Sequence, residues 1–247
     1  MSVRVGLALI SLLSGPSLAL AEGEHDARHM LSMHHGGQTY SYVEGDRLEF
    51  ATGEGDPFLL WDAQGFWGGD LNKLWIKTEG AYDLESDSFG EGEVQALWSR
   101  AIGSFFDFQT GVRRDFAAGP DRTYGVIGVQ GLVPYLFEID AAAFVSGHGD
   151  VTARVELEYE LLITQRLILQ PRAELELSAQ DAPELGLGSG VTSAELGARL
   201  RYEIRRRFAP YVGLSWERSV GGTADLARLA GEDVGETSFV AGVRFWF

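Results

Sequence analysis

This chain of 247 residues has no cysteine, few basic residues and no long apolar run beyond the one near its N-terminus. The absence of cysteine excludes disulfides, thiolate metal sites and cysteine nucleophiles. Lys and Arg total 20 against 36 Asp and Glu, a formal net charge of −16. This balance lacks the basic footprint that nucleic-acid binding needs, so we expect no nucleic-acid partner. No stretch of about 20 apolar residues is present, so no transmembrane helix is expected.

The first residues have the pattern of a secretory signal. Arg4 supplies the positive charge, and Val5–Leu13 is apolar but too short to span a bilayer. Ala19–Ala21 is a small-residue cleavage site, which predicts a mature start at Glu22.

From Tyr40 onward the dominant pattern is alternation of apolar and polar residues. In Val151–Leu161 every apolar side chain is odd-numbered and every charged one is even-numbered. Leu167–Ala179 and Ala194–Ile204 repeat the pattern. These stretches run for about 11 to 14 residues, whereas soluble strands average about 5 to 6 and membrane strands about 9 to 11. Strand length therefore favours a membrane barrel, with apolar side chains facing lipid.

The last strand supports the same architecture. Thr237, Phe239, Val243, Phe245 and Phe247 share one face, and the chain stops on an aromatic residue, as is typical of outer-membrane proteins. An exposed apolar edge of this kind would promote aggregation of a soluble protein. We expect an all-β fold, an antiparallel transmembrane β-barrel of 12 strands, with 10 as the alternative count. With an even count, short turns and longer loops alternate, and both termini are periplasmic.

The expected organisation follows from these boundaries. It comprises a signal peptide (1–21), a short His/Met-containing periplasmic segment (22–39) and an outer-membrane β-barrel (40–247). The expected strands lie near 40–50, 57–67, 71–80, 92–102, 105–116, 122–133, 135–146, 151–162, 166–179, 193–206, 210–219 and 236–247.

Histidine is rare, and four of the 5 histidines lie close together near the mature N-terminus. The candidate metal ligands are His25, His29, Met30, Met33, His34 and His35. Imidazole suits Cu(II), Zn and Ni, whereas the thioether favours Cu(I), so the mixture indicates copper. The alternative is a chance cluster without a metal. We call residues 25–35 the His/Met segment.

Charged residues on the inward face of the strands form a second candidate site. The projected acids are Asp107, Asp115, Glu138, Asp140, Glu156, Glu158, Glu160, Glu174, Glu176, Glu195, Glu203 and Glu217. The projected bases are Arg113, Arg154, Arg172, Arg199, Arg201, Arg205 and Arg244. This face predicts either a cation-attracting lumen or a structural interior filled by Arg–Glu pairs.

Catalytic patterns are weak. His148 is the one histidine outside the His/Met segment, next to Ser146 in a short loop, and a lone loop histidine is usually a surface residue. No phosphate-binding glycine loop and no nucleophile-elbow motif occur. A hydrolase centred on His148 stays only as a formal alternative, and we expect no enzymatic activity.

Four longer motifs resemble the copper resistance protein B family (CopB/PcoB-like). They are Trp61–Trp75, Asp121–Tyr135, Leu162–Arg172 and Glu236–Phe247. The resemblance implies an outer-membrane barrel of a Gram-negative bacterium that binds copper and acts beside a periplasmic multicopper oxidase or copper-binding proteins. Members often carry a long Met- and His-rich segment before the barrel, and here that segment is short.

The sequence therefore predicts a copper-binding outer-membrane barrel that contributes to copper resistance and homeostasis, and it leaves passage of copper across the membrane open. Its expected surroundings are copper ions and outer-membrane lipid. The alternative function is a general porin or structural barrel with an incidental His/Met segment.

Overall fold

The computed structural model describes residues 38–53, 56–117 and 121–247. Residues 39–247 form one compact unit. Its elements are β1 (Tyr40–Gly53), β2 (Phe58–Gly68), β3 (Asn72–Asp83), β4 (Ser88–Ala101), β5 (Phe106–Ala117), β6 (Arg122–Val133), η1 (Pro134–Leu136), β7 (Phe137–Ser146), β8 (Val151–Glu158), β9 (Leu161–Leu162), β10 (Leu167–Ser178), η2 (Pro183–Leu185), β11 (Gly190–Tyr202), β12 (Phe208–Ser219), α2 (Gly221–Ala230) and β13 (Gly235–Trp246).

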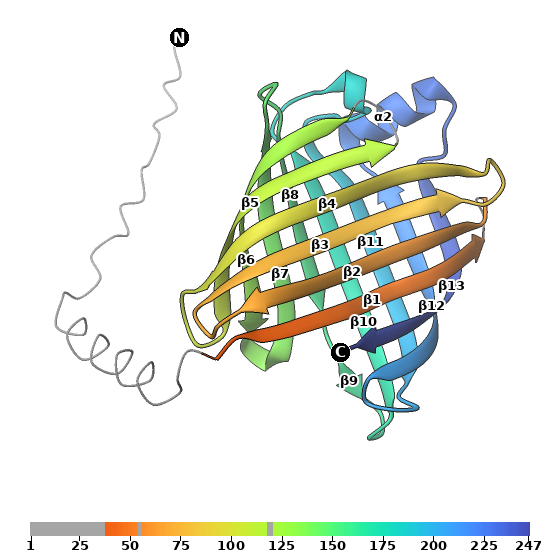
Figure 1. The fold of residues 1–247 in the computed structure, drawn as a ribbon. Helices are drawn as coiled ribbons and strands as arrows, with labels where there is room; N and C mark the ends of the chain where they lie inside the picture. Colours follow the sequence, from red (N-terminus) through yellow and green to blue (C-terminus); the bar gives the residue numbers. More distant parts are fainter. Residues whose placement is uncertain (1–37, 54–55, 118–120) are drawn as a thin grey trace, which may run out of the picture. The chain divides into compact units, whose positions relative to one another are not determined.

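The strands form one closed antiparallel barrel (Figure 1). Each strand pairs with its neighbours in sequence, and β13 pairs with β1 to close the ring. β8 and β9 are two parts of one strand, interrupted opposite Pro171 of β10, which has no backbone N–H to donate. Counted this way the barrel has 12 strands, as the alternation predicts, and the alternative count of 10 is wrong.

The two rims differ in their connections. Five short turns gather at one rim, for example Pro134–Leu136, whereas η2 and α2 lie in the two long connections at the other. Since outer-membrane barrels have short periplasmic turns and longer extracellular loops, we assign the short-turn rim to the periplasm. β1 begins at this rim and β13 ends there. The two lie side by side, since the Val43 backbone N–H donates to the Phe247 carbonyl.

Two details depart from the expected strands. The loop expected near 81–91 is shorter, because β3 and β4 continue to Asp83 and Ser88. The long connection before β13, expected to be irregular, contains α2, which ends at Gly231 in the left-handed conformation (φ 80°). A left-handed glycine is a common helix C-cap.

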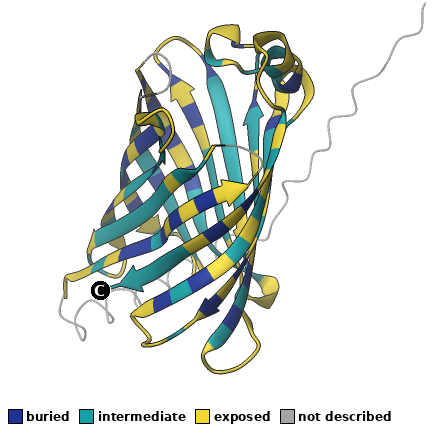
Figure 2. Cartoon of the chain, turned by 90° about the vertical axis from the view of Figure 1, so that its right-hand side faces the viewer, coloured by how far each residue is buried: buried dark blue, intermediate teal, exposed yellow. Residues whose placement is uncertain are grey.

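Large apolar side chains cover the outside of the barrel, and burial alternates along the strands (Figure 2). Trp67, Ile127, Val212 and Phe239 are each more than half exposed. Apolar side chains outside and charged ones inside are what a lipid environment requires. No helix in the described part of the chain could cross a bilayer.

Candidate functional site

Much of the barrel interior is occupied by buried charged side chains. Arg47, Glu49, Arg172 and Arg199 are each less than 5% exposed. The two-residue period of the strands puts these side chains inward, while their neighbours face outward. A buried charge is costly unless it is paired, so the geometry of these pairs determines what the interior can do.

Arg154 connects walls of the barrel that are distant in sequence. It lies on β8, and its Nη1 is 3.1 Å from Glu79 Oε2 on β3, while its Nη2 is 3.1 Å from Glu93 Oε2 on β4. It also contacts Glu176 at 3.1 Å and Glu174 at 3.5 Å on β10. One guanidinium therefore links two separate parts of the barrel wall, β3–β4 and β8–β10.

Arg172 and Arg47 extend this network around the lumen. Arg172 contacts Glu156 at 2.9 Å and Glu195 at 2.8 Å. Arg47 contacts Glu79 and lies 3.2 Å from Asp62. We call these residues the central belt: Arg47, Arg154 and Arg172 with Asp62, Glu79, Glu93, Glu156, Glu174, Glu176 and Glu195. Arg154 is the fourth residue of β8 and lies in the extracellular half of the barrel, whereas Arg47 and Arg172 lie near the middle of β1 and β10.

A second cluster lies closer to the periplasmic rim and is centred on Arg244. Its guanidinium contacts Glu44 at 2.7 Å, Asp46 at 2.9 Å and Glu160 at 3.0 Å. Arg201 also contacts Glu160, at 2.5 Å. These pairs join β1, β11 and β13 to the segment between β8 and β9.

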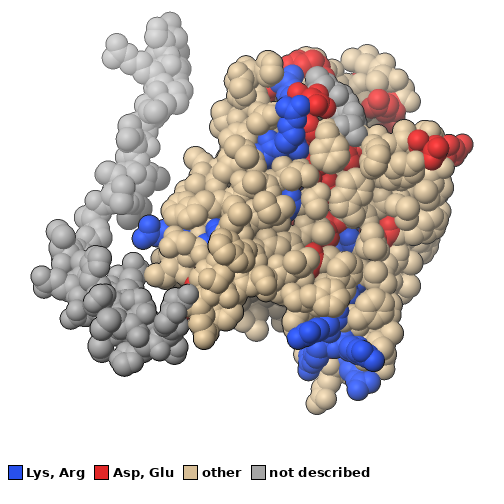
Figure 3. Space-filling view, viewed as in Figure 1, with Lys and Arg blue, Asp and Glu red and all other residues tan. Residues whose placement is uncertain are grey.

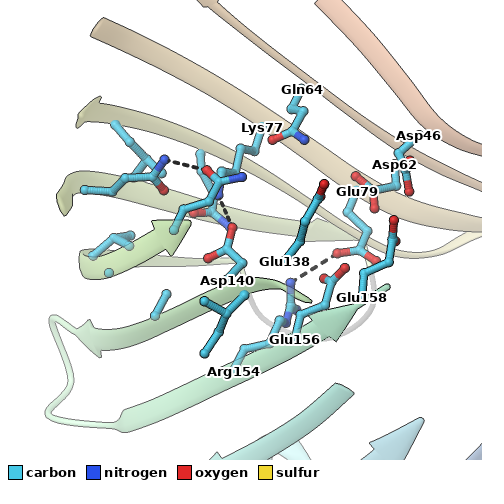
Figure 4. Close-up of a pocket in the computed structure, with 18 of the residues that line it drawn as sticks. Asp46, Asp62, Gln64, Lys77, Glu79, Glu138, Asp140, Arg154, Glu156 and Glu158 are labelled. Carbon is cyan, nitrogen blue, oxygen red and sulfur yellow. Dashed lines mark hydrogen bonds and ion pairs between the residues drawn. The ribbon is translucent and has the colours of Figure 1, made fainter. Parts of the chain in front are cut away.

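A cavity of about 290 Å³ lies beside the central belt. In Figure 4, Glu79, Glu138, Glu156 and Glu158 point into the same space, and Arg154 borders it. The cavity also reaches Leu132, next to the periplasmic turn at Pro134–Leu136. Nine carboxylates line it, against three cations: Glu44, Asp46, Asp62, Glu79, Glu93, Glu138, Asp140, Glu156 and Glu158 against Lys77, Arg154 and Arg244. The cavity is thus acidic and adjoins the periplasmic end.

A further cavity of about 250 Å³ shares Glu44 and Arg244 with the first. It is also lined by Glu203 and Arg206 of the periplasmic turn between β11 and β12. The Arg244 cluster therefore stands between the two spaces.

One wall of the interior is apolar and aromatic, which the sequence did not predict. Trp75, Leu97, Tyr124, Val126 and Phe144 form a buried cluster on β3, β4, β6 and β7. The Arg113 guanidinium lies 4.6 Å from the Phe144 ring centroid, within the range of a cation–π contact. Leu97, Val126 and Phe144 of this cluster also line the 290 Å³ cavity.

A β-bulge at Asp46 explains the inward residues that sequence reasoning missed. The register shifts between Gly45 and Arg47, so Glu44 faces inward before the bulge and Arg47 and Glu49 face inward after it. A bulge adds one residue and reverses the parity of the strand. In the sequence, charged residues flank Gly45 on both sides. Alternation alone does not identify a bulge from this pattern.

Most of the projected inward residues lie in ion pairs or line the two cavities; among the described residues Glu217 does neither, and Arg205 lies outside the lumen. The expectation that Arg205 faces the lumen is wrong, because β11 ends at Tyr202 and Arg205 lies exposed in the following turn. The sequence predicted either a cation-attracting lumen or an interior filled by Arg–Glu pairs, and the structure contains features of both. Ion pairs fill part of the interior, and an acidic cavity remains beside them.

The remaining candidate residues are those of the His/Met segment and of the loop that contains His148. His25, His29, Met30, Met33, His34 and His35 lie outside the described residues. The backbone N–H of His148 donates to Ser146 Oγ at 3.1 Å, and the Ser146 hydroxyl donates to Asp150 at 2.7 Å.

Within residues 38–53, 56–117 and 121–247, no group of three His, Cys, Asp or Glu side chains could hold a metal ion. The cavity carboxylates are spread around the wall, and several are held by arginines. The described interior can therefore attract cations electrostatically, but it offers no chelating set.

Comparison with solved structures agrees with the barrel. KdgM porin aligns with a TM-score of 0.53 at 13% identity, covering 83% of this chain and 99% of that one. NanC porin aligns with a TM-score of 0.52 at 12% identity and the same coverage. At this identity the likeness concerns the fold alone.

Sequence comparison gives a closer match. "Copper resistance protein B homolog" of Pseudomonas syringae pv. tomato is 42% identical over 207 residues, which cover 84% of this chain and 70% of that protein. "Copper resistance protein B" of Escherichia coli is 42% identical over 202 residues, which cover 82% and 68%. The model of the family described as copper resistance protein B precursor (CopB) matches residues 39–247. These similarities and the porin-like barrel place the chain in the outer membrane with a role in copper resistance. The chain belongs to the copper resistance protein B family.

Proposed function

We propose that this barrel binds copper ions at the periplasmic face of the outer membrane and admits them to its acidic interior, without catalysing a reaction. The observation that carries the proposal is the cavity beside the periplasmic turns, where nine carboxylates face three cations. A concave surface with one dominant sign of charge concentrates counter-ions. Family membership makes copper the cation to test first.

The His/Met segment and the cavity supply different chemistry. The imidazoles and thioethers of the segment are good copper ligands, so this segment captures the ion. The cavity carboxylates attract Cu²⁺ but do not form a closed ligand set, so the ion stays exchangeable. A periplasmic multicopper oxidase or copper-binding protein is the partner that would deliver or receive copper at this rim.

Copper titration of the mature protein in detergent tests the proposal. We expect stoichiometric binding that is lost when His25, His29, Met30, Met33, His34 and His35 are all replaced by alanine. In a second variant, Glu138→Gln with Glu158→Gln, we expect tight binding to persist while weak binding of further ions declines.

A matched control replaces two exposed carboxylates outside the lumen, Asp121→Asn with Asp225→Asn, and should change neither type of binding. Tight binding that survives removal of the His/Met segment would place capture elsewhere in the chain. Absence of copper binding, together with free leakage of small solutes through reconstituted barrels, would contradict the proposal and favour a general porin.

A further inference from the structure

A cluster of arginines with few acidic partners lies at the periplasmic rim of this acidic protein. Arg205, Arg206 and Arg207 occupy the turn between β11 and β12, and Arg166 lies in the neighbouring turn before β10. The two turns are joined, since the Glu203 backbone N–H donates to the Arg166 carbonyl at 2.8 Å. Figure 3 shows Lys and Arg gathered at the lower end of the molecule, below a largely uncharged band. We call these four residues the rim arginines.

The backbone of the turn is held firmly. Arg205 and Phe208 exchange two backbone hydrogen bonds of 3.2 and 3.0 Å, so Arg206 and Arg207 are the central residues of a tight hairpin. Trp246 fixes this hairpin to β13, because its indole Nε1–H donates to the Arg206 carbonyl at 2.7 Å. The Arg207 guanidinium lies 5.2 Å from the Trp246 ring centroid. The turn therefore presents its arginines in a defined place.

The positive charge of this cluster is mostly unpaired. Within the part of the chain that the structure describes, Arg206 is the one rim arginine with an ion pair, at 3.1 Å with Glu203, and its side chain is still 74% exposed. Among the described residues, the side chains of Arg166 and Arg205 have no hydrogen bond or ion pair. The lumen arginines differ, because Arg154 and Arg172 each contact several carboxylates. A fixed, unneutralised group of guanidinium ions is suited to an anionic ligand.

The surroundings of the rim arginines indicate which anion this is. Exposed apolar side chains adjoin them on the two turns and on the neighbouring strand ends: Leu162, Ile163, Ile204, Phe208 and Phe247. In a membrane barrel such side chains contact lipid, so the adjacent guanidinium groups lie near the height of the lipid head groups. Arginine pairs with phosphate through two parallel hydrogen bonds.

We propose that the rim arginines bind the phosphate head groups of anionic phospholipids in the periplasmic leaflet. This site is distinct from copper binding in its ligand, and it borders the periplasmic mouth of the lumen, because Arg206 also lines the 250 Å³ cavity. It anchors the β11–β12 turn, and through Trp246 the last strand β13, to the membrane surface.

Fluorescence quenching by brominated lipid tests the proposal on the full mature protein. The barrel is reconstituted in phosphatidylcholine nanodiscs that contain a small fraction of brominated phosphatidylglycerol. Because Trp246 lies under Arg207, we expect stronger quenching by this lipid than by brominated phosphatidylcholine. The difference between wild type and Trp246→Phe isolates the contribution of Trp246.

The variant Arg205→Gln, Arg206→Gln, Arg207→Gln should weaken the preference for phosphatidylglycerol about tenfold to a hundredfold, since each basic residue near an anionic surface contributes about a fivefold factor. The matched control removes three exposed arginines near the opposite rim, Arg114→Gln, Arg218→Gln and Arg228→Gln, and should keep the preference. Heat-dependent migration in gels checks that each variant is folded.

An equal loss in both triple variants would show a general effect of net charge and overturn the proposal. Equal quenching of the wild type by the two brominated lipids would also overturn it, leaving an acidic periplasmic protein as the alternative occupant of the surface. Neither result depends on copper, so the proposed copper function can fail or hold independently.

Discussion

Replacing Arg154 by glutamine should open the barrel interior. The Arg154 guanidinium contacts Glu79, Glu93, Glu174 and Glu176, from three strands, and borders the 290 Å³ cavity. Glutamine is shorter and uncharged, so it cannot make these cross-lumen contacts. The substitution removes the link on the extracellular side of an acidic cavity that reaches the periplasmic turns.

The cost in stability can be estimated from the remaining partners. Glu93 keeps Arg113 at 2.8 Å, Glu174 keeps Arg172 at 2.5 Å, and Glu79 keeps Arg47. Breaking a buried ion pair costs about 3–5 kcal/mol when the partner is left uncompensated. Because the partners here stay partly compensated and Glu176 is more than a third exposed, we expect a loss of about 3 kcal/mol or less.

Two measurements check this reasoning. Urea unfolding of the refolded barrel gives the change in stability, and planar-bilayer recording gives the conductance. We expect Arg154→Gln to raise single-channel conductance severalfold and to favour cations, since the nine cavity carboxylates remain. Arg154→Lys keeps the charge and should give an intermediate conductance.

The matched control is Arg114→Gln, because Arg114 and its partner Asp121 are both more than half exposed. Loss of such a pair costs about 0–1 kcal/mol and should leave the conductance unchanged. A folded Arg154→Gln barrel with wild-type conductance would refute the view that Arg154 restricts the lumen. An anion-selective current would refute the acidic interior as the source of selectivity.

Three further outcomes are expected. Arg199→Met should destabilise the barrel by about 3–5 kcal/mol in urea unfolding, because the buried Glu49 then keeps, among the described side chains, the Tyr211 hydroxyl at 3.0 Å as its one partner; adding Glu49→Gln should restore part of the loss. Gly111→Ala should lower stability by about 1–3 kcal/mol, since a Cβ there would lie 2.0 Å from the Ala96 carbonyl oxygen, and Gly147→Ala, in open space, is its control. Copper affinity of the His/Met segment should fall as pH drops through about 6.5, because protonated imidazoles cannot bind the metal; titration at pH 7.5 and 5.5 checks this, and equal affinity at both values would exclude histidine ligands.

Strand number and barrel class could be predicted because alternation persists over whole strands. In β8 and β10, one face of the strand meets lipid and the other meets the lumen, so apolar and polar residues alternate along almost the whole strand. The bulge at Asp46 could not be predicted, because one extra residue reverses the inward face without changing the composition. Arg47 and Glu49 were missed for this reason.

The partners within the lumen could not be predicted either. Arg199 and Glu49 lie 150 residues apart, and they meet only because β13 closes against β1. Alternation places a charge on the inward face, but it does not give the height or the rotamer that selects its partner. Helix α2 was missed because its ten residues lie in a connection that lacks strand alternation.

The pairing pattern bears on how copper would move through such a barrel. Arg154 holds carboxylates in the extracellular half of the barrel, whereas Glu138, near the periplasmic turns, has no ion pair among the described residues. In the proposed function, a cation that enters from the periplasm passes Glu203 with Arg206 and then the Arg244 cluster before it reaches Glu138, so arginines lie on both sides of the acidic cavity. Exit to the outside then requires the Arg154 contacts to separate. In the proposed function, this arrangement favours holding a copper ion in the cavity over free diffusion through an open channel.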